Sequence, residues 1–331
     1  MKPHARFLHW TVYFCLALSM RIEAEVNKTE TVAADVYFHE GDLGRKGHCN
    51  NGWIVFKDYV LVIDGNFPSG AQEVIPKIKA ITDKPIRFAF NTHHHGDHAY
   101  GNKRWLDNGA VAVAHEGALE EMRRYETGLF GDKPGRWEET AKTRPDVAAS
   151  KLEPPSLLFR KEMIFDDGAH RVELMHFGVA HTRGDGWAWL PKERILFSGD
   201  ACVNGPYNYV GDGSVKDWID TLEAVKKLKP RLVCPGHGPT GGPEMLEAQQ
   251  RYFVTLSKEV KNLVNAGKNS AEVKAAIEGI KTTLRKDETI ARYLGGMFES
   301  QVEKIYVEMG GKPFEKAAAA AEKHWKEART R

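Results

Sequence analysis

The N-terminal part of the chain alternates short apolar runs with longer amphipathic stretches. Runs rich in β-branched and aromatic residues predict strands, and apolar positions three or four residues apart predict helices. Strands come first as a meander and then alternate with helices, so the pattern predicts an α/β class. The predicted strands cover residues 36–39, 53–56, 59–63, 86–90 and 111–114, and the predicted helices cover residues 69–81, a stretch after His98, and residues 116–126.

A second strand-rich region follows a stretch of glycines, prolines and basic residues at 127–156, which predicts a long loop without regular elements. From residue 244 onward only helical periodicity remains. We therefore predict one α/β domain over residues 25–242 and a helical extension over residues 243–331. The predicted strands of this region cover residues 172–176, 186–190, 195–197 and 232–234, and the predicted helices cover residues 215–228, 244–265, 270–277, 288–308 and 314–328.

The first 24 residues have the pattern of an export signal. Lys2 and Arg6 precede an apolar run of about 14 residues, and Ala24 ends a plausible cleavage site. The run is shorter than the roughly 20 residues that cross a bilayer. We therefore expect an exported protein, periplasmic or secreted, with a signal peptide at 1–24 and no stable membrane insertion.

The charge outside this segment is balanced. The chain has 331 residues, 47 Lys and Arg against 45 Asp and Glu, and a net charge of +2 that residues 1–24 supply. A neutral remainder provides no field that steers nucleic acid to the protein, so we expect a small-molecule substrate and no nucleic-acid partner. The sequence leaves the oligomeric state open.

Cysteine spacing predicts no covalent framework. Cys15 lies in the expected signal peptide, which leaves Cys49, Cys202 and Cys234 without any Cys-x-x-Cys pair. An odd number without paired spacing excludes a disulfide scaffold and a zinc ribbon. We expect at least one free thiol.

The densest chemical motif is Thr-His-His-His-Gly-Asp-His at 92–98, directly after a predicted strand. Imidazole and carboxylate groups suit zinc or another first-row metal, and alternation points His94 away from its neighbours. Three more residues with metal-ligating side chains lie at the ends of later predicted strands: His181, Asp200 in Phe-Ser-Gly-Asp, and His237 in Pro-Gly-His-Gly. Together these residues provide seven ligands, enough for two metal ions.

In this order the motifs resemble the metallo-β-lactamase superfamily over residues 36–239, and the run Tyr-Val-Gly-Asp-Gly at 209–213 resembles its exported hydrolases. The resemblance implies a four-layer αβ/βα sandwich with additional C-terminal helices and with the metals at one edge of the sheets. It implies a first metal held by His93, His95 and His181, a second held by Asp97, His98 and His237, and a bridge formed by Asp200.

The resemblance also implies a reaction. Two Zn²⁺ ions, with Fe or Mn as alternatives, share a water, lower its pKa and provide a hydroxide that attacks a strained or activated carbonyl. Asp97 orients this water and shuttles its proton. Asp200 stands where the best-known dizinc β-lactamases have cysteine, which makes the ligand set similar to those of glyoxalase II and lactonases. Candidate substrates are β-lactams, lactones and thioesters.

Five more residues are candidates with two interpretations each. Asp64 is expected to support the metal ligands or to form a turn, and Thr182 has the same ambiguity. Tyr207, Asn208 and Tyr209 follow Asp200 in a loop, where they line the substrate pocket or belong to the core.

The sequence is also compatible with two other functions. The first is a mononuclear iron dioxygenase acting on persulfides, because related folds use a similar His, His, Asp set. The second is a metal-stabilised binding protein without turnover. Metal content distinguishes the first alternative, and activity on esters, thioesters or lactams distinguishes the second.

Overall fold

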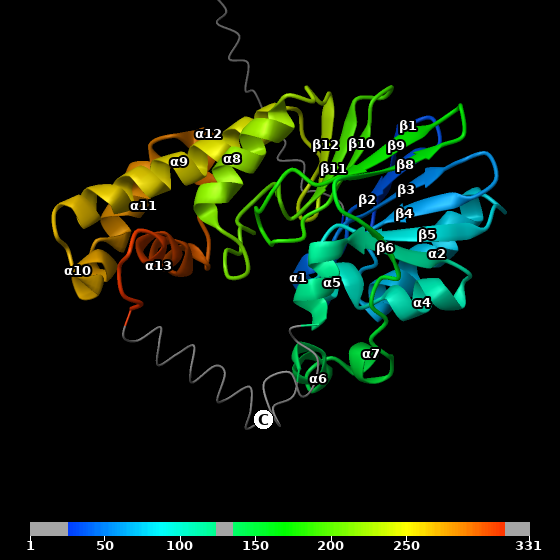
Figure 1. Ribbon diagram of the computed structural model, residues 1–331, viewed down its shortest axis with the longest axis horizontal. Helices are drawn as coiled ribbons and strands as arrows, with labels where there is room; N and C mark the ends of the chain where they lie inside the picture. The colour runs from blue at the N-terminus through cyan, green and yellow to red at the C-terminus, as the bar shows by residue number, and fades with distance from the viewer. Residues whose placement is uncertain (1–25, 124–134, 315–331) are drawn as a thin grey trace, which may run out of the picture.

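The computed structural model describes residues 26–123 and 135–314, which form two β-sheets packed face to face (Figure 1). The expected signal peptide, residues 127–134 of the predicted loop and residues 315–328 of the last predicted helix lie outside the described residues. The first sheet has the order β1 (Thr29–Ala33), β2 (Val36–His39), β3 (Asn51–Val55), β4 (Val60–Ile63), β5 (Ile86–Asn91), β6 (Val111–His115) and β7 (Leu157–Phe159). The second has the order β12 (Leu232–Pro235), β11 (Ile195–Gly199), β10 (Trp187–Leu190), β9 (Arg171–Met175) and β8 (Glu162–Asp166).

Three hydrophobic cores separate four layers. Strand β4 shows why, because side chains alternate across a strand. Val60 and Val62 pack toward helices α2 (Pro68–Ile81) and α4 (Asn102–Asp107), while Leu61 and Ile63 pack toward the second sheet. On the other side, α8 (Val215–Lys226) and α9 (Glu244–Asn265) cover the second sheet through a third core. The predicted αβ/βα sandwich with additional C-terminal helices is confirmed.

The C-terminal helices continue the outer layer of the second sheet and extend to its left in Figure 1. Phe253, Phe298 and Val302 share one core with Trp187 of β10 and Trp218 of α8. No helix in residues 26–123 and 135–314 is both long enough and apolar enough to span a membrane. The helices are α9, α10 (Ser270–Ala275), α11 (Ile277–Arg285), α12 (Glu288–Ala291) and α13 (Phe298–Glu308).

Two predicted helix boundaries were wrong. The helix predicted at 270–277 ends at Ala275 and is followed by α11, which the sequence pattern did not predict. The helix predicted at 288–308 is two helices, α12 and α13, because the pair Gly295-Gly296 lies between them. Glycine lacks a side chain and is unfavourable inside a helix.

The prediction of a loop without regular elements at 127–156 was also wrong for its described part. It contains α6 (Arg136–Ala141) and α7 (Pro145–Ala148), and proline starts α7 because its fixed φ suits the first helical position. The Asp146 carboxylate accepts hydrogen bonds from the Ser69 backbone N–H at 3.1 Å and from the Ser69 hydroxyl at 2.6 Å. The segment is thereby fastened to the start of α2, beside the site described next.

Candidate metal centre

Three histidines from two loops form the first ligand group. His93 and His95 follow β5, and His181 lies in the loop between β9 and β10. The Nδ1 atom of His95 lies 3.1 Å from His93 Nε2 and 2.9 Å from His181 Nε2. Burial and the neighbouring imidazole of His95 lower the pKa of His181 to about 3. Neutral imidazoles whose nitrogens face one point are the arrangement that a metal cation requires.

A second group lies beside the first. The short helix α3 (Gly96–Ala99) carries Asp97 and His98, and His237 follows β12. Asp97 Oδ2 lies 3.1 Å from His237 Nε2 and 3.5 Å from His98 Nε2. Burial by itself lowers the pKa of His237, but Asp200 and Asp97 outweigh burial and raise it to about 9.

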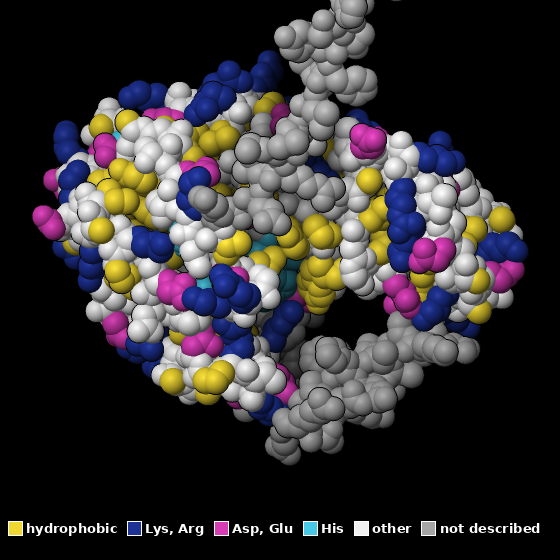
Figure 2. Space-filling model, turned by 180° about the vertical axis from the view of Figure 1, so that it is seen from behind, with side chains coloured by type: hydrophobic (Ala, Val, Ile, Leu, Met, Phe, Trp, Pro, Cys, Tyr) yellow, Lys and Arg dark blue, Asp and Glu magenta, His cyan; other side chains and the backbone are white. Residues whose placement is uncertain are grey.

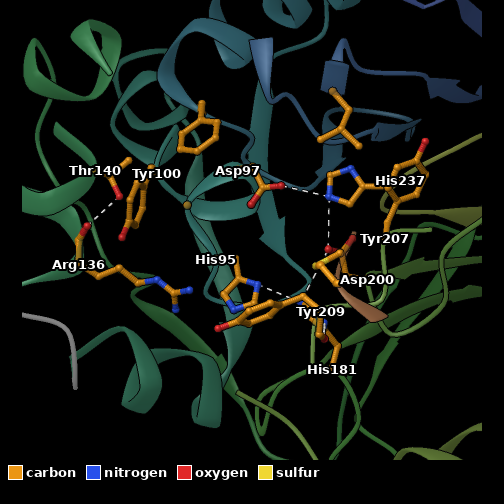
Figure 3. Close-up of a pocket in the computed structure, with 14 residues that line it drawn as sticks. His95, Asp97, Tyr100, Arg136, Thr140, His181, Asp200, Tyr207, Tyr209 and His237 are labelled. Carbon is orange, nitrogen blue, oxygen red and sulfur yellow. Dashed lines mark hydrogen bonds and ion pairs between the residues drawn. The ribbon is translucent and has the colours of Figure 1, made fainter. Parts of the chain in front are cut away.

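Asp200 connects the two groups (Figure 3). Its Oδ2 atom lies 3.3 Å from His237 Nε2 and 3.7 Å from His181 Nε2, and its Oδ1 atom lies 3.4 Å from His98 Nε2. The close packing of Asp200 also explains the glycine in Pro-Gly-His-Gly, because a Cβ at Gly236 would lie 2.1 Å from Asp200 Oδ1. All seven predicted metal ligands therefore converge.

The residues present fit metal ions. Among the described residues, the buried atoms Asp200 Oδ1 and His98 Nε2 have no hydrogen-bond partner. Buried polar atoms are nearly always bonded, so two such atoms facing one another are a donor set that fits a cation. The set of imidazole nitrogens and carboxylate oxygens suits Zn²⁺, Fe²⁺ or Mn²⁺.

Asp64 lies directly behind the second group. Its Oδ2 atom lies 2.9 Å from His98 Nδ1, and its Oδ1 atom accepts hydrogen bonds from the Thr92 N–H at 2.9 Å and the Thr92 hydroxyl at 2.8 Å. Its φ of 65° also places it in the left-handed region that turn residues use. Asp64 therefore has the geometry of both interpretations, a turn residue and a support for a ligand.

Thr182 holds the loop of His181 through Asp185. Its backbone N–H and its hydroxyl donate to the two Asp185 oxygens, both at 2.8 Å. Burial raises the pKa of Asp185 to about 7 against these hydrogen bonds. A supporting role for Thr182 toward the metals stays a prediction.

Sequence reasoning missed Asp212 and Arg136. Asp212 Oδ2 accepts a hydrogen bond from His95 Nε2 at 2.7 Å and another from Arg136 Nη1 at 2.8 Å. The same oxygen lies 3.7 Å from His94 Nε2, so His94 points toward this carboxylate. The turn Gly211-Asp212-Gly213 is a sequence signal that marks Asp212, whereas nothing in its sequence context marks Arg136.

A cavity of about 340 Å³ opens onto both ligand groups. In Figure 2 histidine side chains lie in a hollow between masses of hydrophobic side chains. Tyr207 and Tyr209 line the cavity, and their role toward a substrate stays a prediction. The Asn208 side chain does not line it: it is fully buried, and the Asn208 backbone carbonyl accepts a hydrogen bond from Gln301 Nε2 at 2.6 Å. The lining residues are Leu43, Phe67, His95, Gly96, Asp97, Tyr100, Arg136, Thr140, His181, Asp200, Tyr207, Tyr209, His237 and Met297.

The C-terminal helices hold the loop that forms one wall of this cavity. Gln249 of α9 accepts from the Val203 N–H at 2.9 Å and donates to the Ala201 carbonyl at 3.2 Å. Gln301 of α13 donates to the carbonyl of Asn208 and accepts from the Tyr252 hydroxyl. Both glutamines are buried, so they satisfy backbone groups of the loop that water does not reach.

Comparison with known proteins defines the class. Residues 44–237 match the family model described as "Metallo-beta-lactamase superfamily". This match covers more than half of the chain, and the chain belongs to that superfamily.

Individual relatives are distant. The chain is 36% identical over 96 residues to metallo-beta-lactamase type 2 of Bacteroides fragilis, covering 26% of this chain and 39% of that protein. It is 23% identical over 229 residues to 2,4-dinitroanisole O-demethylase subunit alpha of Nocardioides sp. (strain JS1661), covering 69% and 54%. It is 26% identical over 202 residues to hydroxyacylglutathione hydrolase of Rhodobacter capsulatus, covering 60% and 62%. In each case the chain spans less than two thirds of the relative.

Solved structures share the fold. A metallo-beta-lactamase from Pontibacter korlensis superimposes with a TM-score of 0.55 at 19% identity, covering 68% of this chain and 98% of that one. The mono-zinc form of the metallo-beta-lactamase FIM-1 from Pseudomonas aeruginosa gives a TM-score of 0.52 at 20% identity, covering 68% and 93%.

Proposed function

We propose that this chain is a metal-dependent hydrolase that uses two metal ions to open a strained or activated carbonyl compound. The observation that carries the proposal is the position of Asp200, whose two oxygens face His98 on one side and His181 and His237 on the other. Membership of the metallo-β-lactamase superfamily and its similarity to hydrolases support the same conclusion. We propose zinc as the metal, with iron or manganese as alternatives.

Bound metal ions would lower the pKa of a shared water, polarise the carbonyl oxygen and stabilise the charge that develops there. Asp97 has the position to orient the attacking water, because its side chain remains 22% exposed and lines the cavity. Burial raises the pKa of Asp97, but His98 and His237 outweigh burial and hold it well below its usual range. In the metal-free chain the carboxylate is therefore ionised. In the loaded protein it would take up a proton from the attacking water and pass that proton to the leaving group.

The cavity supports a small organic substrate. Its volume of about 340 Å³ is at the lower end of ligand pockets, and aromatic rings of Phe67, Tyr100, Tyr207 and Tyr209 form much of its wall. Lactones, thioesters and β-lactams all present an activated carbonyl of suitable size. The hydroxyacylglutathione hydrolases among the relatives favour a thioester, and the aspartate at Asp200 favours lactones and thioesters over β-lactams.

We also propose that the protein is exported. The support is the sequence pattern alone, with Lys2 and Arg6 before an apolar run and Ala24 after it. Expression of the full chain with N-terminal sequencing of the mature protein tests this proposal. We expect mature protein outside the cytoplasm beginning at Glu25, and an unprocessed cytoplasmic chain would contradict export.

The decisive experiment measures metal content and hydrolysis together. Zinc-loaded protein is assayed on a chromogenic cephalosporin, a simple lactone and a hydroxyacylglutathione thioester, beside chelator-treated protein and Asp200→Ala. The surface variant Asp166→Asn is the control, since Asp166 is the exposed last residue of β8 and does not line the cavity. We expect turnover of at least one compound, with loss in the chelated protein and in Asp200→Ala only.

Two results would contradict the hydrolase. Protein that holds two zinc ions and hydrolyses none of the three compound classes would favour a binding protein. A single iron per chain with oxygen consumption on a persulfide would favour the dioxygenase.

A further inference from the structure

The α6–α7 segment, residues 136–148, is held to the rest of the protein mainly by polar and aromatic contacts. Figure 1 shows α6 and α7 at the lower edge of the molecule, outside the helices that cover the first sheet. Among the residues of these two described helices, Val147 is the one that is buried. Local stability follows buried apolar contacts, so we expect the segment to open at a lower free energy than the three cores.

One attachment of the segment leads to the first ligand group. Arg136, at the start of α6, extends toward His95 (Figure 3). Its Nη1 atom donates to Asp212 Oδ2 at 2.8 Å, and the same oxygen lies 2.7 Å from His95 Nε2. The opposite nitrogen of His95, Nδ1, faces His93 and His181. Two consecutive contacts therefore connect a candidate metal ligand to the segment.

The other end of the segment is attached away from the metal centre. The Asp146 carboxylate accepts hydrogen bonds from the Ser69 N–H and hydroxyl, and Arg144 pairs with it at 3.3 Å. Arg144 Nη1 also donates to the Lys46 carbonyl at 2.9 Å, and its guanidinium lies 3.5 Å from the centre of the Phe67 ring. Asp146 and Ser69 are outside the set of residues that line the metal cavity. A change at Asp146 therefore loosens the segment without altering the metal ligands.

Metal binding decides which nitrogen of His95 carries the ring proton. A neutral imidazole has one N–H, on either nitrogen. Without a metal ion, a proton on Nδ1 can be donated to His93 Nε2 at 3.1 Å or to His181 Nε2 at 2.9 Å, and Nε2 then meets Asp212 with lone pair against lone pair. When Nδ1 coordinates a metal ion, the proton is on Nε2 and is donated to Asp212. Coordination therefore selects the tautomer that keeps Asp212 in place for Arg136.

We propose that metal binding at the first ligand group and attachment of the α6–α7 segment are coupled through Asp212 and Arg136. The inference rests on the proposed function, since it takes the first ligand group to hold a metal ion. Coupling is reciprocal, so a metal ion that favours the attached segment is itself bound more tightly when the segment is attached. Because Arg136 and Thr140 line the metal cavity, the coupling makes one wall of the cavity depend on the metal ion.

Hydrogen–deuterium exchange tests one direction of the coupling. Exchange of the backbone amides of residues 136–148 is measured in metal-free protein and in excess Zn²⁺, and bound zinc is counted by elemental analysis. We expect zinc to slow this exchange about 5- to 50-fold in the wild type and less than about twofold in Arg136→Leu, which lacks the donor to Asp212. Helix α11 is the internal reference, because its buried residues belong to the core behind the second sheet and report a general tightening of the fold.

Zinc affinity tests the other direction, from the far end of the segment. Asp146→Ala removes the acceptor of both Ser69 hydrogen bonds, and Asp146→Asn is a milder variant that keeps one acceptor oxygen. Glu139→Ala is the matched control, because it removes a carboxylate that pairs with Lys142 inside the segment. By competition with a chromogenic chelator, we expect the affinity to fall about 3- to 30-fold in Asp146→Ala, less in Asp146→Asn, and less than about twofold in Glu139→Ala.

Four results would overturn the coupling while the metal centre stands. They are bound zinc that leaves exchange of the segment unchanged, equal slowing in the segment and in α11, slowing that persists in Arg136→Leu, and equal zinc affinities in Asp146→Ala and Glu139→Ala. Wild-type protein that binds no zinc would contradict both the coupling and the proposed function.

Discussion

Asp212 accepts a 2.7 Å hydrogen bond from the His95 ring nitrogen that faces away from the other two imidazoles. A carboxylate in this position fixes the tautomer of the histidine and makes the opposite nitrogen a stronger metal ligand. We expect Asp212→Asn to weaken metal binding about 10- to 100-fold. Competition with a chromogenic chelator measures the change, and Asp220→Asn on the exposed side of α8 is the control. Equal affinities in the two variants would show that the contact does not tune the ligand.

We expect substitution of Asp200 to change the number of metal ions that the protein binds. Asp200 Oδ1 faces His98 of the second group and Oδ2 faces both His237 of that group and His181 of the first, so Asp200→Asn removes charge from both sites at once. We expect wild-type protein to hold two ions after dialysis and Asp200→Asn to hold one or none, as measured by elemental analysis. Retention of two ions by the variant would show that Asp200 is not a bridging ligand.

Gln301 does not line the cavity, but we expect its substitution to change both the stability of the protein and substrate binding in the cavity. Gln301→Ala leaves the buried carbonyl of Asn208 and the hydroxyl of Tyr252 without this partner. We expect the free energy of unfolding to fall by about 1–3 kcal/mol. Because the loop with Tyr207 and Tyr209 loses an attachment, KM should rise more than kcat falls. Ser300 is exposed on the same helix, and Ser300→Ala should leave the free energy of unfolding and the KM close to the wild-type values.

The raised pKa of Asp185 should make the stability of the protein depend on pH. Burial raises the pKa of this carboxyl from its ordinary 3.8 to about 7, so between these values the folded chain holds a proton that the unfolded chain has released. The contribution of the protonated form is complete below about pH 4 and is lost as pH rises through 7. At about 1.4 kcal/mol per pH unit, the loss approaches about 4 kcal/mol.

Urea unfolding of metal-free protein at pH 5 and pH 8 measures this effect. We expect Asp185→Asn, which cannot ionise, to gain stability relative to wild type as the pH rises. Parallel curves for the two proteins would show that Asp185 titrates near its ordinary pKa.

Much of the fold follows from local patterns. Strand β2 and helix α9 were predicted with the observed bounds, because β2 is a compact apolar run and α9 has a long amphipathic period. Strand β1 was not predicted, since Thr29–Ala33 lies at the edge of the sheet with half-exposed residues that carry no clear alternation. The helices of residues 135–148 were hidden by prolines and glycines, which mark helix starts as well as loops.

The convergence of the seven candidate ligands was predictable because their chemistry is concentrated in short motifs at strand ends. Their partners were not, because Arg136 reaches Asp212 across 76 residues of chain and Gln301 reaches Asn208 across 93. Such contacts depend on tertiary packing, and an arginine or glutamine in a helix has no local feature that distinguishes it from a surface residue. Asn208 was predicted to line the pocket with Tyr207 and Tyr209 or to belong to the core; its side chain is buried, because adjacent residues in a loop need not face the same side.

Gln249 and Gln301 hydrogen-bond to main-chain atoms of Ala201, Val203 and Asn208, in the loop that follows Asp200. Main-chain hydrogen bonds do not depend on which side chains the loop carries. We therefore expect the backbone of the loop to keep its path when Tyr207 or Tyr209 is exchanged, even though their rings contact His237 and His95. The candidate metal ligands and the side chains that line the cavity can then vary independently of one another. Libraries randomised at these two tyrosines should yield folded, metal-loaded proteins with altered substrate ranges.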